Sequence, residues 1–363
     1  LWANHVGNYL VEPLAIKSQV SPVISPHCFC YILIGVMSMQ DLFSRQIEYL
    51  RIAVTDRCNL RCTYCMPAEG VALKHHTEIL TLEEIYRVVQ AAVSLGISKI
   101  RLTGGEPLVR KGLVSLVEKI RSLPEIKDIS LTTNGILLTK YAQDLKKAGL
   151  NRVNISLDTL DKNKFCQITR LGEIGYIHQG IDAALQAGLE PVKLNVVVIK
   201  GVNDDEILDF IELTRHKPIH VRFIELMPIG ESDANALTSY IPAEEIKQMV
   251  ERTYHLAPFL NLQGSGPAKY YQVPGFRGTA GFIGALSQHF CQNCNRLRLT
   301  ADGKLRPCLH KNIEYDLRKP LRAGVSLEEL QEIVRYTILH KPKEHDMTKG
   351  WGKQERIMSQ IGG

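Results

Sequence analysis

The sequence has no apolar stretch near its beginning that could cross a membrane. The apolar run from Cys28 to Met37 has about ten residues, whereas a transmembrane helix needs about 20. No basic segment precedes this run, no small-residue cleavage site follows it, and arginine is absent from residues 1–36. Neither a signal peptide nor a mitochondrial transit peptide is therefore indicated. We interpret residues 1–38 as an extension that is disordered or non-native, ahead of a natural start near Met37 or Met39.

The sequence also lacks the cysteine distribution of a disulfide-stabilised secreted protein. Six of its nine cysteines fall in two short triads, and the other three are scattered along 363 residues. A secreted disulfide framework is typically a short chain with cysteines throughout its length. Clustered thiols in a chain of this size predict metal binding in a reducing compartment, which we expect to be the cytoplasm.

Composition and charge exclude little. Apolar residues make up 45% of the chain and charged residues 23%, which are ordinary values for a globular protein. The length predicts about two domains. The net charge is 44 − 38 = +6, which fits an anionic substrate such as a nucleotide but is common among unrelated enzymes.

Between residues 50 and 227 the pattern alternates between short β-branched runs and amphipathic segments. This alternation predicts right-handed βαβ units around a parallel sheet. Six units are present, so we expect an α/β fold with a partial (βα)6 TIM-type barrel over residues 39–228. Residues 229–363 would form a C-terminal region. The expected strands are 50–55, 100–103, 129–133, 152–157, 192–199 and 221–226, and the expected helices are 82–94, 113–122, 140–148, 176–187 and 204–214.

Polar residues follow the expected strands at the ends where barrel enzymes place their sites. Lys193 is unusual because it lies inside an otherwise apolar strand, and either an anionic ligand or a buried salt bridge would explain it. The other polar groups at strand ends are residues 103–107 (TGGEP), 132–135 (TTNG), 156–158 (SLD), Asn195 and residues 225–228 (ELMP).

The first cysteine triad follows the first expected strand. The segment from Arg51 to Pro67 reads RIAVTDRCNLRCTYCMP and carries Cys58, Cys62 and Cys65 in a C-x3-C-x2-C pattern. A structural zinc site needs four protein ligands, so zinc would require a distant histidine. A four-iron cluster held by three cysteines instead leaves one iron open to another ligand.

The second triad lies in a different setting. Beyond residue 228 we expect a helix over 243–252 and an irregular, glycine-rich segment over 264–284. Cys291, Cys294 and Cys308 then surround an expected hairpin whose turn lies at residues 301–303. Zinc completed by His289 or His310 is an alternative here. Alternation places Arg296 and Arg298 on one face beside the metal, which favours phosphate binding because arginine binds phosphate in a bidentate manner.

These motifs resemble those of a known family. The first triad, the aromatic residue just before its last cysteine and the TGGEP turn resemble the radical S-adenosylmethionine (SAM) enzymes. Together with the second triad and the NRLRLT strand they resemble the GTP 3′,8-cyclase family, from about Met39 to the C-terminus.

The resemblance implies a role for each motif residue. Two [4Fe-4S] clusters and SAM would be the cofactors, with Cys58, Cys62 and Cys65 on cluster 1 and Cys291, Cys294 and Cys308 on cluster 2. SAM would contact Tyr64, Gly105, Ser156 and Met227. GTP would contact Arg51, Arg101, Thr132, Lys193, Arg296, Leu297 and Arg298, with Lys99 and Arg222 as further candidates, and Gly362 and Gly363 would support catalysis.

The implied reaction is the first step of molybdenum cofactor biosynthesis. A 5′-deoxyadenosyl radical would take the hydrogen from C3′ of GTP, giving (8S)-3′,8-cyclo-7,8-dihydroguanosine 5′-triphosphate. The resemblance also implies a reducing electron donor, delivery of the product to cyclic pyranopterin monophosphate synthase, and no nucleic-acid or membrane partner; it leaves a homodimer open. Rival interpretations are a peptide-modifying radical SAM enzyme and a non-catalytic metal-binding regulator of nucleic acid.

Overall fold

The computed structural model describes residues 39–227, 229, 238–260, 262, 264, 266–345 and 356–362. The expected extension over residues 1–38 lies outside the described residues, and so do Pro228 and Gly363. None of the described helices is both long enough and apolar enough to span a membrane.

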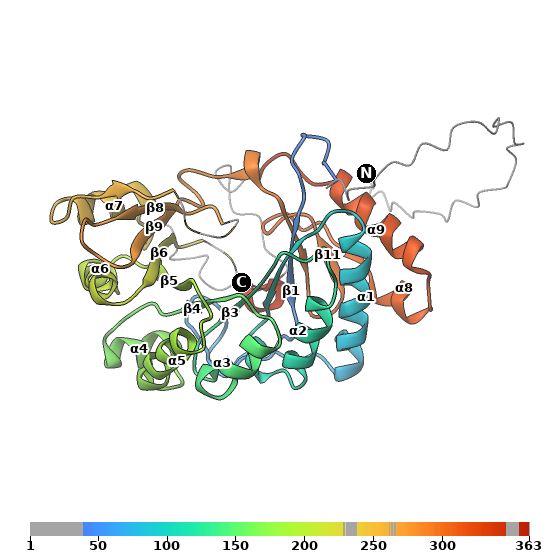
Figure 1. Cartoon of the computed structure of the whole chain (residues 1–363), viewed down its shortest axis with the longest axis horizontal. Helices are drawn as coiled ribbons and strands as arrows, with labels where there is room; N and C mark the ends of the chain where they lie inside the picture. The colour runs from blue at the N-terminus through green and yellow to red at the C-terminus, as the bar shows by residue number, and fades with distance from the viewer. Residues whose placement is uncertain are drawn as a thin grey trace, which may run out of the picture. The chain divides into compact units, whose positions relative to one another are not determined.

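Six parallel strands form the centre of the sheet (Figure 1). They lie in the order β1-β2-β3-β4-β5-β6, and each overlaps an expected strand with ends that differ by at most two residues. The expected α/β class with six βα units is confirmed. The strands are β1 (Tyr49–Ala53), β2 (Lys99–Thr103), β3 (Asp128–Thr133), β4 (Arg152–Ser156), β5 (Val192–Val198) and β6 (Ile219–Glu225).

Helices that follow these strands pack on the outer face of the sheet. The first of them begins with a capping box in which Thr81 and Glu84 bond to each other's backbone N–H groups, an arrangement that satisfies donors left free at a helix start. The helices are α1 (Leu82–Val93), α2 (Leu113–Arg121), α3 (Leu138–Lys147), α4 (Lys162–Thr169), α5 (Ile174–Gln186) and α6 (Ile207–His216).

Sequence reasoning missed α4. This helix has only eight residues and begins at an Asp161 cap that accepts a hydrogen bond from the Lys164 N–H group. Its buried apolar side chains are only Phe165 and Ile168, which is too few to give a clear helical period. The capping aspartate was the available signal.

Strands from the C-terminal half extend the sheet at both edges. β10 (Arg296–Leu299) pairs in parallel with β1, and β9 (Thr279–Ile283) pairs in parallel with β6. The outer strands are β11 (Lys304–Arg306) and β12 (Tyr315–Asp316) beyond β10, and β8 (Lys269–Gln272) and β7 (Ala257–Pro258) beyond β9. The sheet therefore runs through both parts of the chain, and the division expected at residue 228/229 stays a prediction.

The segment over residues 264–284 corrects one expectation. It is not irregular throughout, because it contains β8 and β9. Gly281 lies inside β9, where a Cβ would come within 2.8 Å of the Tyr270 ring and 3.3 Å of the Arg222 side chain. Glycine is normally a poor strand residue, but here it permits close packing of neighbouring side chains. The hairpin expected after Cys294 is confirmed as β10 and β11.

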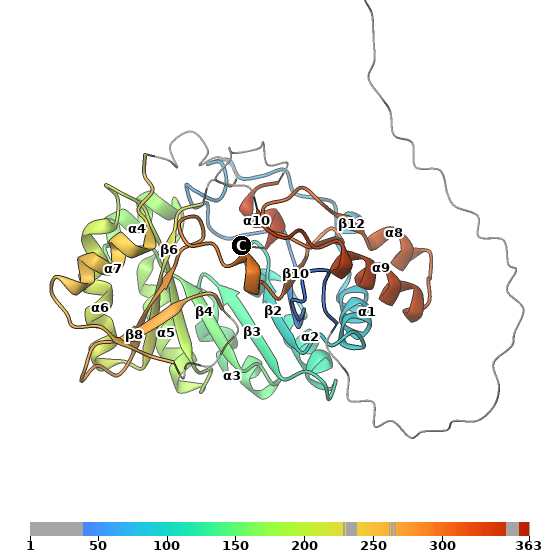
Figure 2. The same ribbon diagram turned by 90° about the horizontal axis from the view of Figure 1, so that it is seen from above.

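Four further helices belong to the C-terminal half. α9 packs against α1 on the outer face, whereas Figure 2 shows α10 on the opposite side of the sheet from α2 and α3. These helices are α7 (Ala243–Glu251), α8 (Arg318–Arg322), α9 (Leu327–Leu339) and α10 (Met358–Ile361).

Alternation along the strands separates two sets of side chains. One set is apolar and fully buried under the helices, and it includes Ile52, Ile100, Leu131, Ile155 and Leu194. The intervening positions carry Arg51, Arg101, Ser130, Asn154 and Lys193. A parallel sheet covered on both faces is normally apolar throughout, so the polar set marks the inner face as the place for a ligand.

Two buried carboxyl groups fasten the loops at the strand ends. Glu225 ends β6 and accepts hydrogen bonds from the N–H groups of Ala243 and Leu286, each at 2.7 Å. Glu106 lies in the TGGEP turn and accepts from the Asn134 N–H and the Thr133 hydroxyl, each at 2.7 Å. Burial raises the pKa of Glu106 to about 7, although these hydrogen bonds favour its charged form.

The raised pKa predicts a pH-dependent stability. The folded protein holds the Glu106 proton more tightly than the unfolded chain, whose glutamate has the ordinary value of 4.5. The resulting stabilisation is complete below about pH 4.5 and is lost as pH rises through 7. Relative to Glu106→Gln, the wild type should lose up to about 3 kcal/mol of unfolding free energy between pH 5 and 8. Urea denaturation at several pH values measures this difference.

Glu118→Gln, on the exposed face of α2, is the control and should follow the wild type. An identical pH dependence in wild type and Glu106→Gln would contradict the prediction.

Candidate active site

The first triad lines a cavity of about 210 Å³ at the carboxyl ends of the strands. We call it the first-triad cavity. Cys58, Cys62 and Cys65 form one wall, and Tyr64 lies among them. The remaining lining residues include Thr103, Gly104, Gly105, Thr132, Ser156, Asp158, Asn195, Ile224, Met227, Met358 and Ser359.

Helix α4 holds the cysteine loop in place. The N–H groups of Arg61 and Thr63 donate to the carbonyls of Thr169 and Ile168 at 3.0 and 2.9 Å. Arg170, which ends the helix, donates to the Met66 carbonyl at 2.9 Å. The loop thus takes its shape from backbone contacts with a neighbouring helix.

Tyr64 is fixed by a buried acid. Its hydroxyl donates to Asp158 at 2.6 Å, and the other oxygen of that carboxylate accepts the Val197 N–H at 2.8 Å. Burial raises the pKa of Asp158 to about 6, and burial and the nearby Asp158 raise the pKa of Tyr64 well above its usual value. Near neutral pH the pair is a neutral phenol bonded to a carboxylate, which orients the ring beside Cys65.

The TGGEP turn is joined to the start of the cysteine loop. Gly105 and Glu106 donate their N–H groups to the carbonyls of Thr55 and Arg57 at 2.9 and 2.8 Å. A Cβ at Gly105 would collide with the Arg57 carbonyl oxygen. Glycine is therefore required for the two segments to approach, and the turn exposes backbone polar groups to the cavity.

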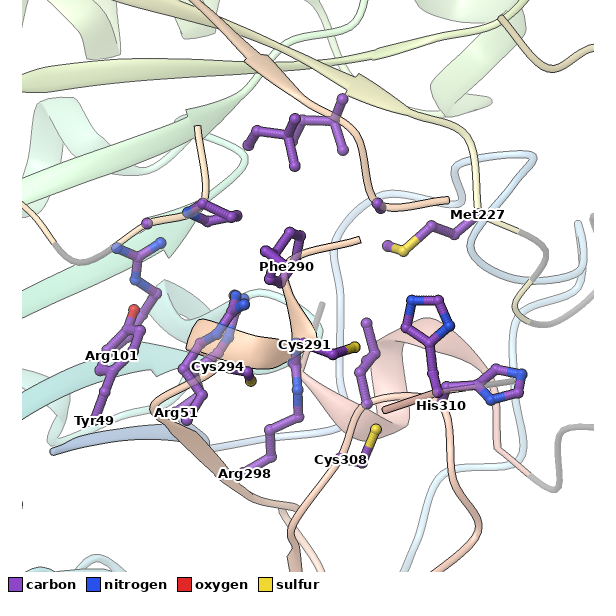
Figure 3. Close-up of a pocket in the computed structure, with 18 of the residues that line it drawn as sticks. Tyr49, Arg51, Arg101, Met227, Phe290, Cys291, Cys294, Arg298, Cys308 and His310 are labelled. Atoms are coloured by element: carbon purple, nitrogen blue, oxygen red, sulfur yellow. The ribbon is translucent and has the colours of Figure 1, made fainter. Parts of the chain in front are cut away.

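The second triad lines another cavity, of about 190 Å³, which we call the second-triad cavity. Figure 3 shows Cys291, Cys294 and Cys308 around this cavity, with Arg298 and His310 close to them. Cys291 and Cys294 lie at a single 3-10 turn, and Cys308 follows β11. The cavity also takes in Tyr49, Arg51, Arg101, Asn195, Arg222, Ile224, Met227, Phe290, Arg296, Lys341, His345 and Met358.

The thiols differ in their electrostatic setting. Burial raises the pKa of Cys65 to about 12. Burial also raises the pKa of the Cys294 thiol, but Arg296 and Lys341 together lower it to about 6. Within the described ranges no three His, Cys, Asp or Glu side chains are grouped so as to hold one metal ion. Each triad instead surrounds a cavity.

A layer of buried cations covers the inner face of the sheet between the two triads. Register places Arg51 of β1 beside Arg298 on one side and Arg101 on the other. Among the described residues, the buried donors of this layer without a hydrogen-bond partner are Arg51 Nε, Arg152 Nη1 and Arg222 Nε. Burial, together with the nearby charges of Arg222 and Arg152, lowers the pKa of Lys193 to about 6. Buried donors left unsatisfied are costly, so this face is built for an anionic ligand.

The register also separates the triads. Cys58 follows the carboxyl end of β1, whereas Cys294 precedes β10, which runs parallel to β1 with Tyr49 opposite Arg296. The triads therefore lie at opposite ends of one strand pair, separated by five residues of β1, or roughly 15 Å. Asn195, Ile224, Met227 and Met358 line both cavities, so the two spaces adjoin.

The C-terminal segment reaches this junction. The Gly362 carbonyl accepts a hydrogen bond from Arg298 Nη1 at 3.1 Å. A Cβ at Gly362 would lie 2.9 Å from the Thr103 side chain and 3.2 Å from that of Ala53. Arg356 ties the segment to the hairpin through Asp302 at 3.1 Å and Glu314 at 2.6 Å.

The structure brings most of the expected site residues to these two cavities, but the described residues Lys99, Lys193, Leu297 and Gly362 line neither of them. Thr132, expected near GTP, lies in the first-triad cavity. Leu297 is fully buried in the apolar core, and Lys193 lies beneath Gly264, 3.1 Å from where a Cβ would be. Lys99 lies at the amino end of β2, where it donates to Glu48 at 2.5 Å. Gly363 is outside the described residues.

Several residues of the site escaped sequence reasoning. Arg152 joins the cation layer and pairs with Asp128 at 2.5 Å, and its position opening a strand two residues before Asn154 was the available signal. Lys341 lines the second-triad cavity from the end of α9, far from any motif. No local pattern could have indicated it.

Comparisons with known proteins agree with this geometry. Residues 52–214 match the family model described as Radical SAM superfamily, and residues 219–347 match Molybdenum Cofactor Synthesis C. Among solved structures, the chain is similar to Streptococcus suis SuiB bound to S-adenosylmethionine, with a TM-score of 0.53 at 15% identity over 75% of this chain and 63% of that one. This likeness concerns the fold.

The sequence relatives are closer. The GTP 3′,8-cyclase of Moorella thermoacetica is 59% identical over 325 residues, covering 90% of this chain and 100% of the relative. That of Desulforamulus reducens is 57% identical over 326 residues with the same coverage. With both family models matched in succession and relatives aligned along their full length, this chain belongs to the GTP 3′,8-cyclase family of radical SAM enzymes.

Proposed function

We propose that this chain converts GTP to (8S)-3′,8-cyclo-7,8-dihydroguanosine 5′-triphosphate, the first step of molybdenum cofactor biosynthesis, with each cavity holding one reactant. The observation that carries the proposal is the arrangement of the site. Two adjoining cavities each have three free cysteines, and arginines of the cation layer line the second of them.

The donor sets fit two [4Fe-4S] clusters, the cofactors of this family. Cys58, Cys62 and Cys65 would hold the first and Cys291, Cys294 and Cys308 the second. Three thiolates leave one iron of each cluster for a further ligand. When bound, the first cluster and SAM supply the 5′-deoxyadenosyl radical that removes the hydrogen from C3′ of GTP.

The first-triad cavity would bind SAM. Gly105 exposes backbone polar groups there, and Ser156 and Met227 line the same space as Tyr64. Asp158 holds the tyrosine ring in place through its hydroxyl. These groups would fix the orientation of SAM toward the adjoining cavity, where positioning of reactants contributes most to the rate.

The second-triad cavity would bind GTP. A triphosphate carries several negative charges, which would compensate the repulsion among Arg51, Arg101, Arg222 and Arg298. Water exclusion by these buried walls would protect a radical from side reactions. The Gly362 segment, held by Arg298, would close the junction between the cavities.

The reaction needs a low-potential electron donor, and the product would pass to cyclic pyranopterin monophosphate synthase in the cytoplasm.

Removal of one second-triad cysteine should abolish cyclisation while leaving the first cluster. Anaerobic reconstitution of the wild type should give about eight irons per chain, and Cys291→Ser about four. Incubation with SAM, dithionite and GTP should yield 5′-deoxyadenosine and a cyclised nucleotide with the wild type, and no cyclised nucleotide with Cys291→Ser. Cys166→Ser, at an exposed cysteine on α4, is the matched control.

Wild type with about four irons, or with SAM cleavage indifferent to GTP, would contradict the proposal and favour a zinc site or a peptide-modifying enzyme.

Substitution of Arg298 should weaken GTP binding without loss of either cluster. Its guanidinium is buried in the second-triad cavity, and loss of a charged hydrogen-bond donor costs about 1.5–3 kcal/mol. We expect Arg298→Ala to raise the Kd for GTP roughly 10- to 100-fold, as measured by calorimetry, with Arg335→Ala on α9 as control. Unchanged affinity would rule out this role.

Arg356 should be required to seat the C-terminal segment. Arg356→Met removes its ion pairs with Asp302 and Glu314, so the amides of residues 357–362 should exchange hydrogen faster and turnover should fall at unchanged iron content. Arg335→Met, which breaks an exposed pair with Glu332, should change neither. Wild-type exchange rates in Arg356→Met would show that other contacts seat the segment.

A further inference from the structure

Two buried cations brace the second triad through backbone carbonyls. The three cysteines belong to two separate segments, the turn at Cys291–Cys294 and the residue after β11, Cys308. Hydrogen bonds that join these two segments set the distance between the sulfur atoms before a cluster binds.

Arg45 is the first brace. It is 7% exposed, and its Nε donates to Asp41 at 2.6 Å. Its Nη1 donates to the Cys291 carbonyl at 2.8 Å, and its Nη2 donates to the Pro342 carbonyl at 2.7 Å. The Asp41 carboxylate is itself buried and compensates the guanidinium charge.

Lys341 is the second brace, one residue before Pro342. It is 3% exposed and lines the second-triad cavity. Its Nζ donates to the carbonyl of Arg296 at 2.8 Å and to that of Pro307 at 2.5 Å. Arg296 lies two residues after Cys294, and Pro307 lies one residue before Cys308. A single ammonium thus joins the two segments of the triad.

The charge of Lys341 is compensated differently from that of Arg45. Burial lowers the pKa of the Lys341 ammonium and Arg45 and Arg296 add to this effect, whereas thiolates at Cys294 and Cys308 favour its charged form. Its hydrogen bonds go to neutral carbonyls. The ammonium charge therefore interacts at close range with any group that the thiolates bind. The interaction is strong because Coulomb energies are larger in a buried site than in water.

We propose that Lys341 is a positioning residue for the second cluster, which holds the two cysteine segments together and whose charge favours the cluster's reduced form. The inference rests on the proposed function, because that function places a cluster in the second triad. Each reduction adds one electron, supplied by the external donor, to a buried anionic group. A fixed positive charge beside that group raises its reduction potential.

The test isolates the second cluster. In a chain whose first-triad cysteines are replaced by serine, iron content and the midpoint potential are measured by electron paramagnetic resonance with dithionite as reductant. Lys341→Gln keeps hydrogen-bond donors but loses the charge, so it should shift the potential to more negative values. Lys341→Arg should restore it, and Lys343→Gln, at an exposed lysine two residues away, should leave it unchanged.

A second variant should shift the midpoint potential in the opposite direction. Asp41→Asn leaves the Arg45 charge uncompensated near Cys291, so it should shift the potential to more positive values. If Lys341→Gln does not fold, the potential measured for Asp41→Asn tests whether a buried charge beside the triad sets the potential of the second cluster. Iron loss in Lys341→Gln that Lys341→Arg restores supports the brace. A potential that neither Lys341→Gln nor Asp41→Asn changes overturns the inference, whereas absence of a cluster from the otherwise unaltered second triad overturns the proposed function instead.

Discussion

Mutual repulsion among buried cations is the constraint on which the rest of the site depends. Arg51, Arg101 and Arg298 are neighbours in register, and the side chains of Arg101 and Arg298 are buried. Burial and neighbouring charges lower the pKa of each. Asp128, which pairs with Arg152, is the carboxylate that the described ion pairs place in this layer. The free protein is therefore held in a costly charge state, and an anion bound there stabilises the fold by mass action.

Because of the parallel register, a cysteine triad lies at each of the two ends of this cation layer. Because β10 runs beside β1 in the same direction, a triad after β1 and a triad before β10 cannot lie at the same end. The cations occupy the strand positions between them. Residues at the shared wall, such as Asn195 and Met227, then lie where the two reactants would meet. The strand topology thus sets the positions of the two triads, and the side chains at the shared wall set how the reactants would be held.

Sequence reasoning located the features that are encoded by local sequence patterns. Strands such as β5 were predictable because β-branched runs are local, and the cysteines because their spacing is local. Strand β9 was hidden because Gly281 is used for packing against Tyr270. Lys341 was hidden because it lies 33 residues after Cys308 in the sequence, and only the packing of α9 on α1 returns the chain to the triad. Long-range contacts of this kind leave no periodic signal in one sequence.

The strands that cover both edges of the central sheet are synthesised after that sheet. Strands β1 and β6 are the edges of the first six strands, and each is covered by a strand that comes later, β10 and β9. Until Leu299 leaves the ribosome, at least one of these two edges has no partner strand, and an unpaired edge is a template for aggregation. At ordinary synthesis rates the 74 residues from Glu225 to Leu299 take roughly 4–15 s. Chaperones that shield strand edges would act during that interval.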